Sequence, residues 1–205
     1  AEAWMALQPK TAYYTAERVA FRNFVMGLRP PQSAVYKNPY REWIGAQIRG
    51  DLFGYINPGD PAAAAEMAFR DASISHVKNG IYGEMFVAAA LAAAAVCGDL
   101  MTVIQTGLAY IPANCRLRAD VDEILALHAA GADADAAMAH IHSRYDEFSA
   151  HGWCMTNPNT MIVVMALLWG GRDFGKTLCL AVQPGFDTDC NGATAGSILG
   201  MMNGS

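Results

Sequence analysis

The sequence contains little charge and no concentration of positive charge. Only 16% of the 205 residues are charged, and 14 Lys and Arg residues stand against 19 Asp and Glu residues, for a net charge of −5. Without a run of Lys or Arg, the chain lacks the electrostatic footprint of a nucleic-acid-binding protein. Hydrophobic residues make up 53% of the chain, so most of it must be buried in protein. We therefore expect one domain with a large core and no nucleic-acid partner.

Membrane-spanning and disulfide-forming patterns are missing as well. The most apolar stretch, residues 81–96, is short for a bilayer span and contains Glu84, which favours a buried helix. The five cysteines are odd in number, scattered and without a C-x-x-C pair, which argues against a disulfide framework or a zinc site. These features predict a reducing, cytoplasmic environment and no membrane contact. The chain begins with Ala1 and has no signal-like segment, so we expect that an upstream part was removed or not recorded.

No stretch alternates apolar and polar residues for long enough to predict a strand, so the sequence predicts an all-α fold. Asp60, Asp99, Asp133 and Asn157 are candidate N-caps, and Gly131 is a candidate helix end. The proline-rich segment 28–39 is expected to form an ordered loop that buries Val35 and Tyr36. The predicted helices cover residues 15–26, 40–51, 61–71, 80–96, 100–111, 120–130, 134–145, 159–169, 174–182 and 191–202.

The strongest candidate for chemistry is the segment 185–192, which reads GFDTDCNG. Asp187 and Asp189 lie two residues apart where a loop meets the last helix, so both carboxylates can converge on one hard cation. The helix N-terminus behind them can bind an anionic ligand. This pattern suits metal-assisted hydrolysis. The alternative is that Asp189 only caps the helix.

Small residues follow this segment. Gly192, Gly196 and Gly200 recur every fourth residue, and glycine costs about 1 kcal/mol relative to alanine inside a helix. The spacing therefore predicts a close approach of a ligand or of another backbone, and tight helix packing remains the alternative.

Two further segments gather polar side chains. Residues 72–84 place His76, Asn79, Tyr82 and Glu84 between two apolar helices, where they need partners in a binding pocket or in the core. Residues 41–51 contain Arg41, Glu42, Arg49 and Asp51 beside Trp43 and Ile44. For Arg49 and Asp51, we expect internal ion pairs.

In this order, the three segments resemble the ADP-ribosylglycohydrolase family. The family's C-terminal signature is Gly-x-Asp-Thr-Asp followed by small residues, as in 185–196 here. The resemblance implies a compact orthogonal multi-helix bundle that removes ADP-ribose from a modified protein side chain or a small conjugate. It also implies that Asp187 and Asp189 are ligands of two magnesium ions, with manganese as an alternative metal. Cys190 stands where the family has a hydroxyl ligand, and a thiol is a poor donor to a hard cation.

Substrate binding is implied by the same resemblance. The segment 45–49 looks like the tail of a glycine-rich segment that cradles ADP-ribose, and Ser75-His76 resembles a Thr/Ser-His pair near the bound nucleotide. Trp43 and Ile44 depart from the family pattern, which has an Asn there. The residues implied in substrate binding are Gly45, Ala46, Gln47, His76, Asn79, Gly80 and Tyr82.

The family's N-terminal Thr-Asp-Asp motif, which supplies further metal ligands, has no counterpart in a chain without any Asp-Asp pair. We therefore expect residues 1–205 to form one domain that lacks its N-terminal portion, which a missing segment or a partner chain would supply. The acids that could substitute look like solvated residues at helix starts. They are Asp120, Asp122, Glu123, Asp133 and Asp135.

The leading hypothesis is a magnesium-dependent hydrolase of a glycosidic bond to ADP-ribose. One alternative is a catalytically inactive member of the family that binds a nucleotide or has a structural role. The other is a hydrolase of a different nucleoside or glycoside conjugate.

Overall fold

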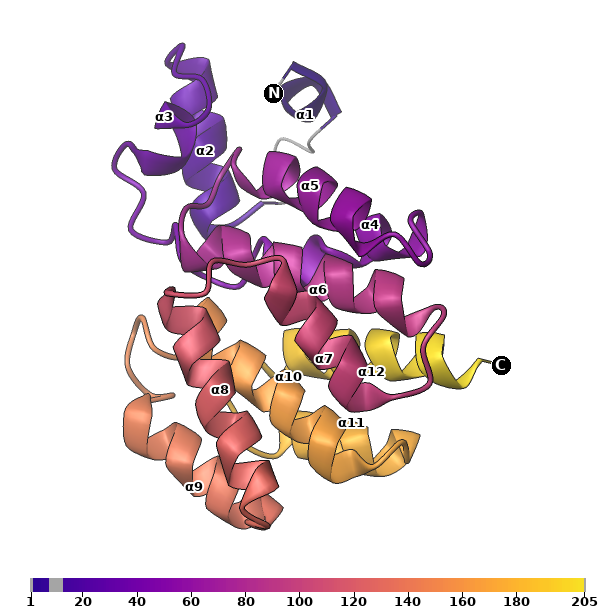
Figure 1. The fold of residues 1–205 in the computed structure, drawn as a ribbon. Coiled ribbons are helices and arrows are strands. Elements are labelled where there is room, and N and C mark those ends of the chain that lie inside the picture. The colour runs from indigo at the N-terminus through magenta and orange to yellow at the C-terminus, as the bar shows by residue number, and fades with distance from the viewer. Residues whose placement is uncertain (1, 8–12, 205) are drawn as a thin grey trace.

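The protein is described by a computed structural model that covers residues 2–7 and 13–204. Over these residues the chain forms twelve α-helices and one short 3-10 helix, and its β-structure is limited to an isolated bridge between Trp43 and Met155 (Figure 1). The all-α prediction is confirmed. The elements are α1 (Glu2–Leu7), α2 (Thr15–Val25), α3 (Gln32–Val35), η1 (Gln47–Arg49), α4 (Asp51–Tyr55), α5 (Pro61–Ala72), α6 (Asn79–Ala94), α7 (Leu100–Ala109), α8 (Arg116–Ala129), α9 (Ala134–Arg144), α10 (Thr156–Gly170), α11 (Phe174–Val182) and α12 (Thr188–Asn203).

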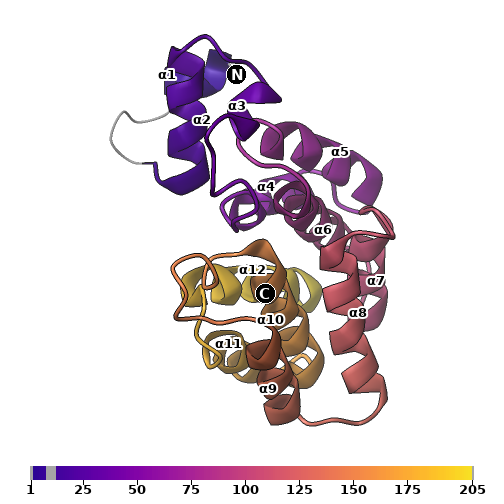
Figure 2. The same cartoon turned by 90° about the vertical axis from the view of Figure 1, so that its left-hand side faces the viewer.

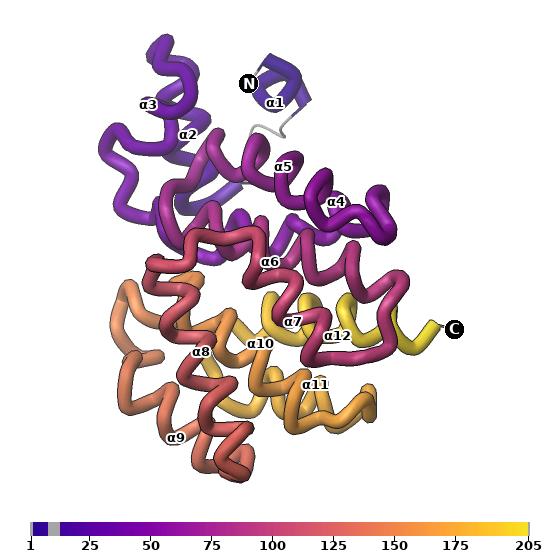
Figure 3. The backbone as a smooth tube through the Cα atoms, in the orientation of Figure 1, coloured from indigo at the N-terminus to yellow at the C-terminus, as the bar shows by residue number. Residues whose placement is uncertain are grey.

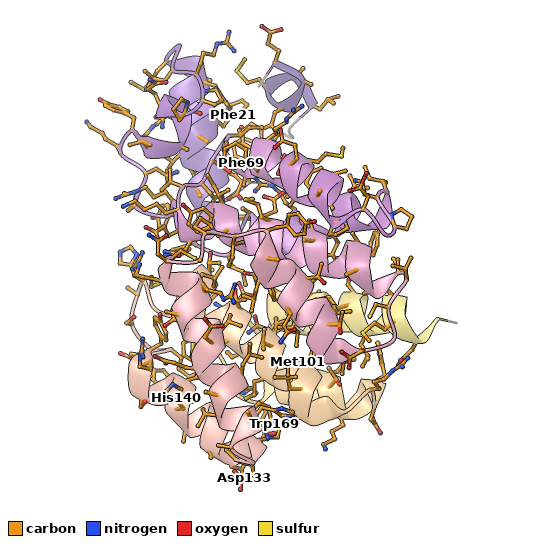
Figure 4. The ribbon with its side chains drawn as sticks, in the orientation of Figure 1. Phe21, Phe69, Met101, Asp133, His140 and Trp169 are labelled. Atoms are coloured by element: carbon orange, nitrogen blue, oxygen red, sulfur yellow. The ribbon has the colours of Figure 1, made fainter. Side chains whose placement is uncertain are left out.

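Two helices, α6 and α10, form the centre of the core. Nearly every residue of both is buried, as expected for helices that are apolar on all sides. Helices α4, α5, α7 and α12 pack on α6, whereas α8, α9, α11 and α12 pack on α10 (Figure 2). The tube in Figure 3 shows the last helix returning beside α6 after the chain has passed through α7 to α11. The side chains in Figure 4 place Phe21 and Phe69 toward the N-terminal end, and Asp133, His140 and Trp169 at the opposite end.

Three predicted helix starts are confirmed by their caps. The side chains of Asp60, Asp99 and Asp133 accept hydrogen bonds from the backbone N–H three residues on, at 3.0, 2.8 and 2.8 Å. Helix α8 ends just before Gly131, which has a φ of +76°. Helix α11 has the predicted bounds.

The predicted helix over residues 40–51 is wrong. Its backbone N–H and C=O groups pair with other segments, as in Ile44 N–H to Cys154 C=O (2.9 Å) and Thr156 N–H to Glu42 C=O (3.1 Å). These bonds replace the intrahelical ladder, so the segment forms turns that end in η1 and α4. This irregular segment runs beside the start of α10.

Three helix starts differ from the prediction. Helix α8 begins at Arg116 behind Cys115, so Asp120 lies inside the helix. Helix α10 begins at Thr156, so Asn157 is not its cap but a buried residue whose amide donates to Asp120. Helix α12 begins at Thr188 and is capped by Asp187 rather than Asp189.

The proline-rich loop is ordered, but it buries other residues than predicted. Val35 and Tyr36 are 52% and 41% exposed, whereas Ser33 and Asn38 are buried. Asn23 of α2 organises the loop, because its amide donates to the carbonyls of Ser33 and Tyr36, each at 2.8 Å. Polar contacts therefore hold this loop, and Ala34 is its fully buried apolar residue.

Candidate active site

A cavity of about 480 Å³ lies between the start of α2, the irregular segment before η1, and the loops that precede α10 and α12. This volume is in the range of small-molecule sites. The residues that line it are Trp4, Tyr13, Tyr14, Thr15, Glu17, Trp43, Ile44, Gly45, Ile48, Arg49, Trp153, Cys154 and Asp187.

Aromatic rings form much of its wall. The rings of Trp43 and Trp153 lie 5.9 Å apart, edge to face, and the Trp43 ring also packs against Tyr40 at 4.8 Å. Trp43 is almost fully buried, whereas Trp153 is 41% exposed and leaves part of its surface free. Such a wall offers flat faces to a base or a sugar.

A charge network lies at the base of the cavity. The Arg49 guanidinium donates through Nη1 to Oε1 of Glu17 at 2.6 Å, through Nε to the carboxylate of Asp71, and through Nη2 to Ser75 at 3.1 Å. Burial raises the pKa of Glu17 above its usual value, although Arg49 acts in the opposite direction. The carboxyl group of Glu17 therefore keeps its proton to a higher pH than an exposed glutamate does.

The second carboxyl group in the cavity is that of Asp187. Its loop turns through Gly185 and Phe186, at φ values of +78° and +57°, and the Phe186 N–H donates to Oε2 of Glu147 at 3.2 Å. The Asp187 side chain accepts from the Cys190 N–H at 3.2 Å as the cap of α12, and from the Cys154 thiol at 3.5 Å. Loop and cap together direct this carboxylate toward the cavity.

Of the predicted metal ligands, Asp187 and Cys190 lie side by side, whereas Asp187 and Asp189 line different hollows. Asp187 lines the cavity, whereas Asp189 is exposed and lines a separate hollow between α11 and α12, beside Phe174 and Val182. Burial raises the pKa of the Cys190 thiol, with a further contribution from Asp187, so the thiol stays protonated. Among residues 2–7 and 13–204, no group of three or more His, Cys, Asp or Glu side chains is arranged to hold a metal ion. The residues present therefore do not fit a magnesium centre made from this trio.

Of the predicted substrate-binding residues, Gly45 lines the cavity, and Ala46, Gln47 and His76 are fully buried outside its lining. The Gln47 side chain accepts from the Thr160 hydroxyl at 2.6 Å. His76 has Nδ1 at 2.8 Å from the Ser75 hydroxyl and Nε2 at 4.0 Å from Oε1 of Glu17. Burial lowers the pKa of His76 well below its usual value, as does the Arg49 charge, so the ring is neutral.

The other three predicted substrate-binding residues, in and beside the start of α6, hold neighbouring segments together. The Asn79 amide donates to Glu42 at 2.7 Å and accepts from the Leu117 N–H at 3.1 Å, which fixes the start of α8. A Cβ atom on Gly80 would lie 2.6 Å from the Arg41 carbonyl oxygen, and Tyr82 packs against the core. In the structure all three lie outside the cavity lining.

Ion pairs involving Arg49 were predicted, and they are found, with Glu17 and Asp71 as its partners. Asp51 takes no part in them, because its carboxylate accepts from the hydroxyls of Ser197 and Tyr55. The prediction of an internal ion pair is therefore wrong for Asp51.

The acids considered as substitute metal ligands lie away from the cavity lining. Asp120 was predicted to be solvated, but it is 2% exposed and accepts from Arg144, Tyr145 and Asn157. Its place in the second turn of α8 explains the difference, because that turn faces α10. The remaining acids pair or cap locally or stay exposed: Asp122 binds Arg118, Glu123 binds His140 and Arg144, Asp133 caps α9, and Asp135 is exposed.

Sequence reasoning missed the residue that shares the cavity with Asp187. Glu17 reads as an ordinary first-turn acid of a helix, and only its ion pair with Arg49 reveals its place. Trp153 and Cys154 were also missed, because they stand in a loop without a recognisable pattern. One sequence signal did point to the cavity: Trp43 and Ile44, which depart from the family pattern, both lie in its wall.

Fold and cavity together describe an all-helical protein with a ligand-sized cavity that contains two carboxyl groups. A family model described as ADP-ribosylglycohydrolase matches residues 1–205, and the chain belongs to this family of glycosidic-bond hydrolases. No curated protein and no solved structure matches the chain. In the part of the chain that the structure describes, no helix is both long and apolar enough to cross a membrane.

Proposed function

We propose that this protein hydrolyses the glycosidic bond between ADP-ribose and a modified protein side chain or small conjugate, and that the conjugate binds in the aromatic cavity. The observation that carries this proposal is the presence of Glu17 and Asp187 in one cavity walled by Trp43 and Trp153. Family membership supports the reaction class, and the two carboxyl groups in the cavity support our proposal for where it takes place.

The two carboxyl groups have different environments, as glycoside hydrolysis requires. In our proposal Glu17, whose pKa is raised by burial, donates a proton to the leaving nitrogen or oxygen as its bond to the anomeric carbon breaks. Asp187 orients a water molecule and accepts its proton as the water oxygen bonds to that carbon. The products are ADP-ribose and the protonated leaving group.

Metal dependence is part of the proposal because the family is generally metal-dependent, with two magnesium ions expected and manganese as an alternative. Only Asp187 of the predicted ligands faces the cavity, so the steps above use the chain's own residues. A magnesium titration of Asp187→Asn and of Asp189→Asn tests whether the two aspartates bind the metal together. Equal loss of magnesium affinity in both variants would support a shared site, and an effect confined to Asp187 would limit the ligand role to that residue.

Turnover of ADP-ribosyl-arginine and ADP-ribosyl-serine peptides, with and without magnesium, tests the reaction. We expect Asp187→Asn and Glu17→Gln each to lower kcat by at least about a hundredfold, the usual contribution of a general acid or base. Asn is as good an N-cap as Asp, so Asp187→Asn should remain folded. Wild-type turnover in both variants would refute the assignment.

A second candidate function is non-catalytic binding of a nucleotide. It is favoured by the position of Asp189, which lies outside the cavity that contains Asp187. Calorimetry with ADP-ribose separates the two functions. Binding that requires magnesium, together with turnover, supports the enzyme, and metal-independent binding without turnover supports the binding protein. Turnover of a nucleoside conjugate without phosphates would instead indicate a different substrate class.

A further inference from the structure

Helix α2 places two arginines with the same charge next to each other on its surface. Arg18 and Arg22 lie one helical turn apart, both are exposed, and neither forms an ion pair with any residue that the structure describes. Like charges at this spacing destabilise a helix. Within the other described helices, the charged pairs at the same spacing have opposite signs, as in Arg70 with Glu66 and Arg118 with Asp122. An unpaired arginine pair in an acidic protein therefore indicates a role other than helix stability.

The two arginines line a groove of about 540 Å³ together with Thr15, Val19 and Tyr40. Two contacts connect this groove to the aromatic cavity. Thr15 lines both hollows, and the Tyr40 ring of the groove packs at 4.8 Å against the Trp43 ring of the cavity. A molecule longer than the cavity can therefore extend from one into the other.

The cavity itself is poorly suited to phosphate. Glu17 and Asp187 place two carboxyl groups in it. Among its described lining residues the only cationic side chain is Arg49, which is already engaged by Glu17 and Asp71. A diphosphate in this position would have to displace those contacts of Arg49. The guanidinium groups of Arg18 and Arg22, by contrast, form no ion pair with a described residue, and Arg22 donates only to the Asn23 side chain, at 3.3 Å. Both can therefore bind phosphate oxygens in the manner that arginine favours.

We propose that the groove lined by Arg18 and Arg22 binds the diphosphate of the substrate. This inference rests on the proposed function. ADP-ribose carries its diphosphate between the adenosine and the second ribose, so a bent molecule can place its ends in the aromatic cavity and its phosphates at the arginines. The subsite selects diphosphate-containing conjugates over nucleosides that lack phosphate.

Binding of ADP-ribose and of adenosine to the full chain tests the subsite. We expect Arg18→Gln and Arg22→Gln each to weaken ADP-ribose binding about tenfold, as for a lost hydrogen bond to a charged group, and adenosine binding less than about twofold. Arg29→Gln is the matched control, because Arg29 is exposed and lines neither hollow. Both test variants should be as stable as the wild type, since a repulsion is removed. If they change ADP-ribose and adenosine affinity by the same factor, or behave like Arg29→Gln, the inference is wrong.

Pyrophosphate alone gives a second readout. Competition between pyrophosphate and ADP-ribose that weakens in Arg18→Gln supports a shared subsite, whereas pyrophosphate binding that leaves ADP-ribose affinity unchanged overturns it. The two proposals fail separately. Arginine-dependent binding without turnover refutes the hydrolase and keeps the subsite, and turnover without arginine dependence refutes the subsite and keeps the hydrolase.

Discussion

Gly45 makes room for the carboxyl group of Glu17: a Cβ atom on residue 45 would lie 2.5 Å from Oε1. That oxygen also accepts from Arg49, so the carboxyl group has little freedom to move. The position of the proposed acid thus depends on a glycine in a different segment.

We expect Gly45→Ala to displace Glu17 and to lower turnover at least about tenfold, with a stability loss of about 1–3 kcal/mol from overpacking and the weakened ion pair. Gly200→Ala is the control, because apart from the neighbouring backbone of its own helix no atom lies within 4 Å of the added methyl group. In the interior of α12 it should stabilise the protein by up to about 1 kcal/mol. Steady-state kinetics and urea unfolding measure both effects, and unchanged kinetics in Gly45→Ala would contradict the role of Glu17.

Trp153 should contribute to binding more than to stability, because 41% of it is exposed. We expect Trp153→Ala to weaken adenosine binding by about 1–3 kcal/mol through lost stacking. Trp169→Phe is the control, since Trp169 lies at the far end of α10, outside the cavity lining, and donates to the Ala132 carbonyl (Figure 4). Equilibrium dialysis with adenosine distinguishes them, and equal affinities in the two variants would remove Trp153 from the site.

The buried acid Glu84 should make stability depend on pH. Burial raises its pKa well above the usual value in the folded protein, and the charge of Arg49 only partly opposes this. Below about pH 4.5 the folded and unfolded states are both protonated, so its stability contribution is fully present there. As the pH rises toward the folded pKa, only the unfolded state releases the proton, and the free energy of unfolding falls by up to about 1.4 kcal/mol per pH unit.

Glu84→Gln removes that loss, so its stability relative to the wild type should rise from pH 4.5 to pH 8. Glu66→Gln, at an exposed position paired with Arg70, should follow the wild-type curve. Urea unfolding at a series of pH values gives both curves. Parallel curves for wild type and Glu84→Gln would show that Glu84 ionises normally.

Asp120 is expected to be a structural acid. Asp120→Asn should lower the free energy of unfolding by about 2–4 kcal/mol, because Arg144, Tyr145 and Asn157 lose part of a buried acceptor. Asp122→Asn, two residues away and exposed, should change it by less than about 0.5 kcal/mol. Thermal melts of both variants measure the difference. Loss of metal affinity in Asp120→Asn at unchanged stability would instead restore it as a candidate ligand.

The helices could be predicted from sequence where local signals determine them. Asp60, Asp99 and Asp133 each precede an apolar helix and cap it, and these interactions involve only neighbouring residues. Residues 40–51 show where such signals fail. Their composition suits a helix, but bonds to Cys154 and Thr156, far along the chain, determine their conformation.

The site was predictable only in part for the same reason. Asp187 belongs to a recognisable motif, and it does line the cavity. Glu17 stands in an ordinary helix start, and its role depends on the burial and the ion pair that the fold creates. His76 and Asn79 have polar side chains whose partners lie in distant segments, so sequence alone could not separate pocket from core.

The pairing of Ile44 with Cys154 and of Thr156 with Glu42 joins the two sides of the cavity by backbone hydrogen bonds. Because the paired segments are far apart in sequence, these contacts close a long loop and are costly to form early during folding. The amide protons of Ile44 and Thr156 should therefore exchange with solvent together, at the rate at which the cavity opens. A bound conjugate touching both sides should slow their exchange in parallel, which makes these two amides reporters of occupancy even for a ligand that is never turned over.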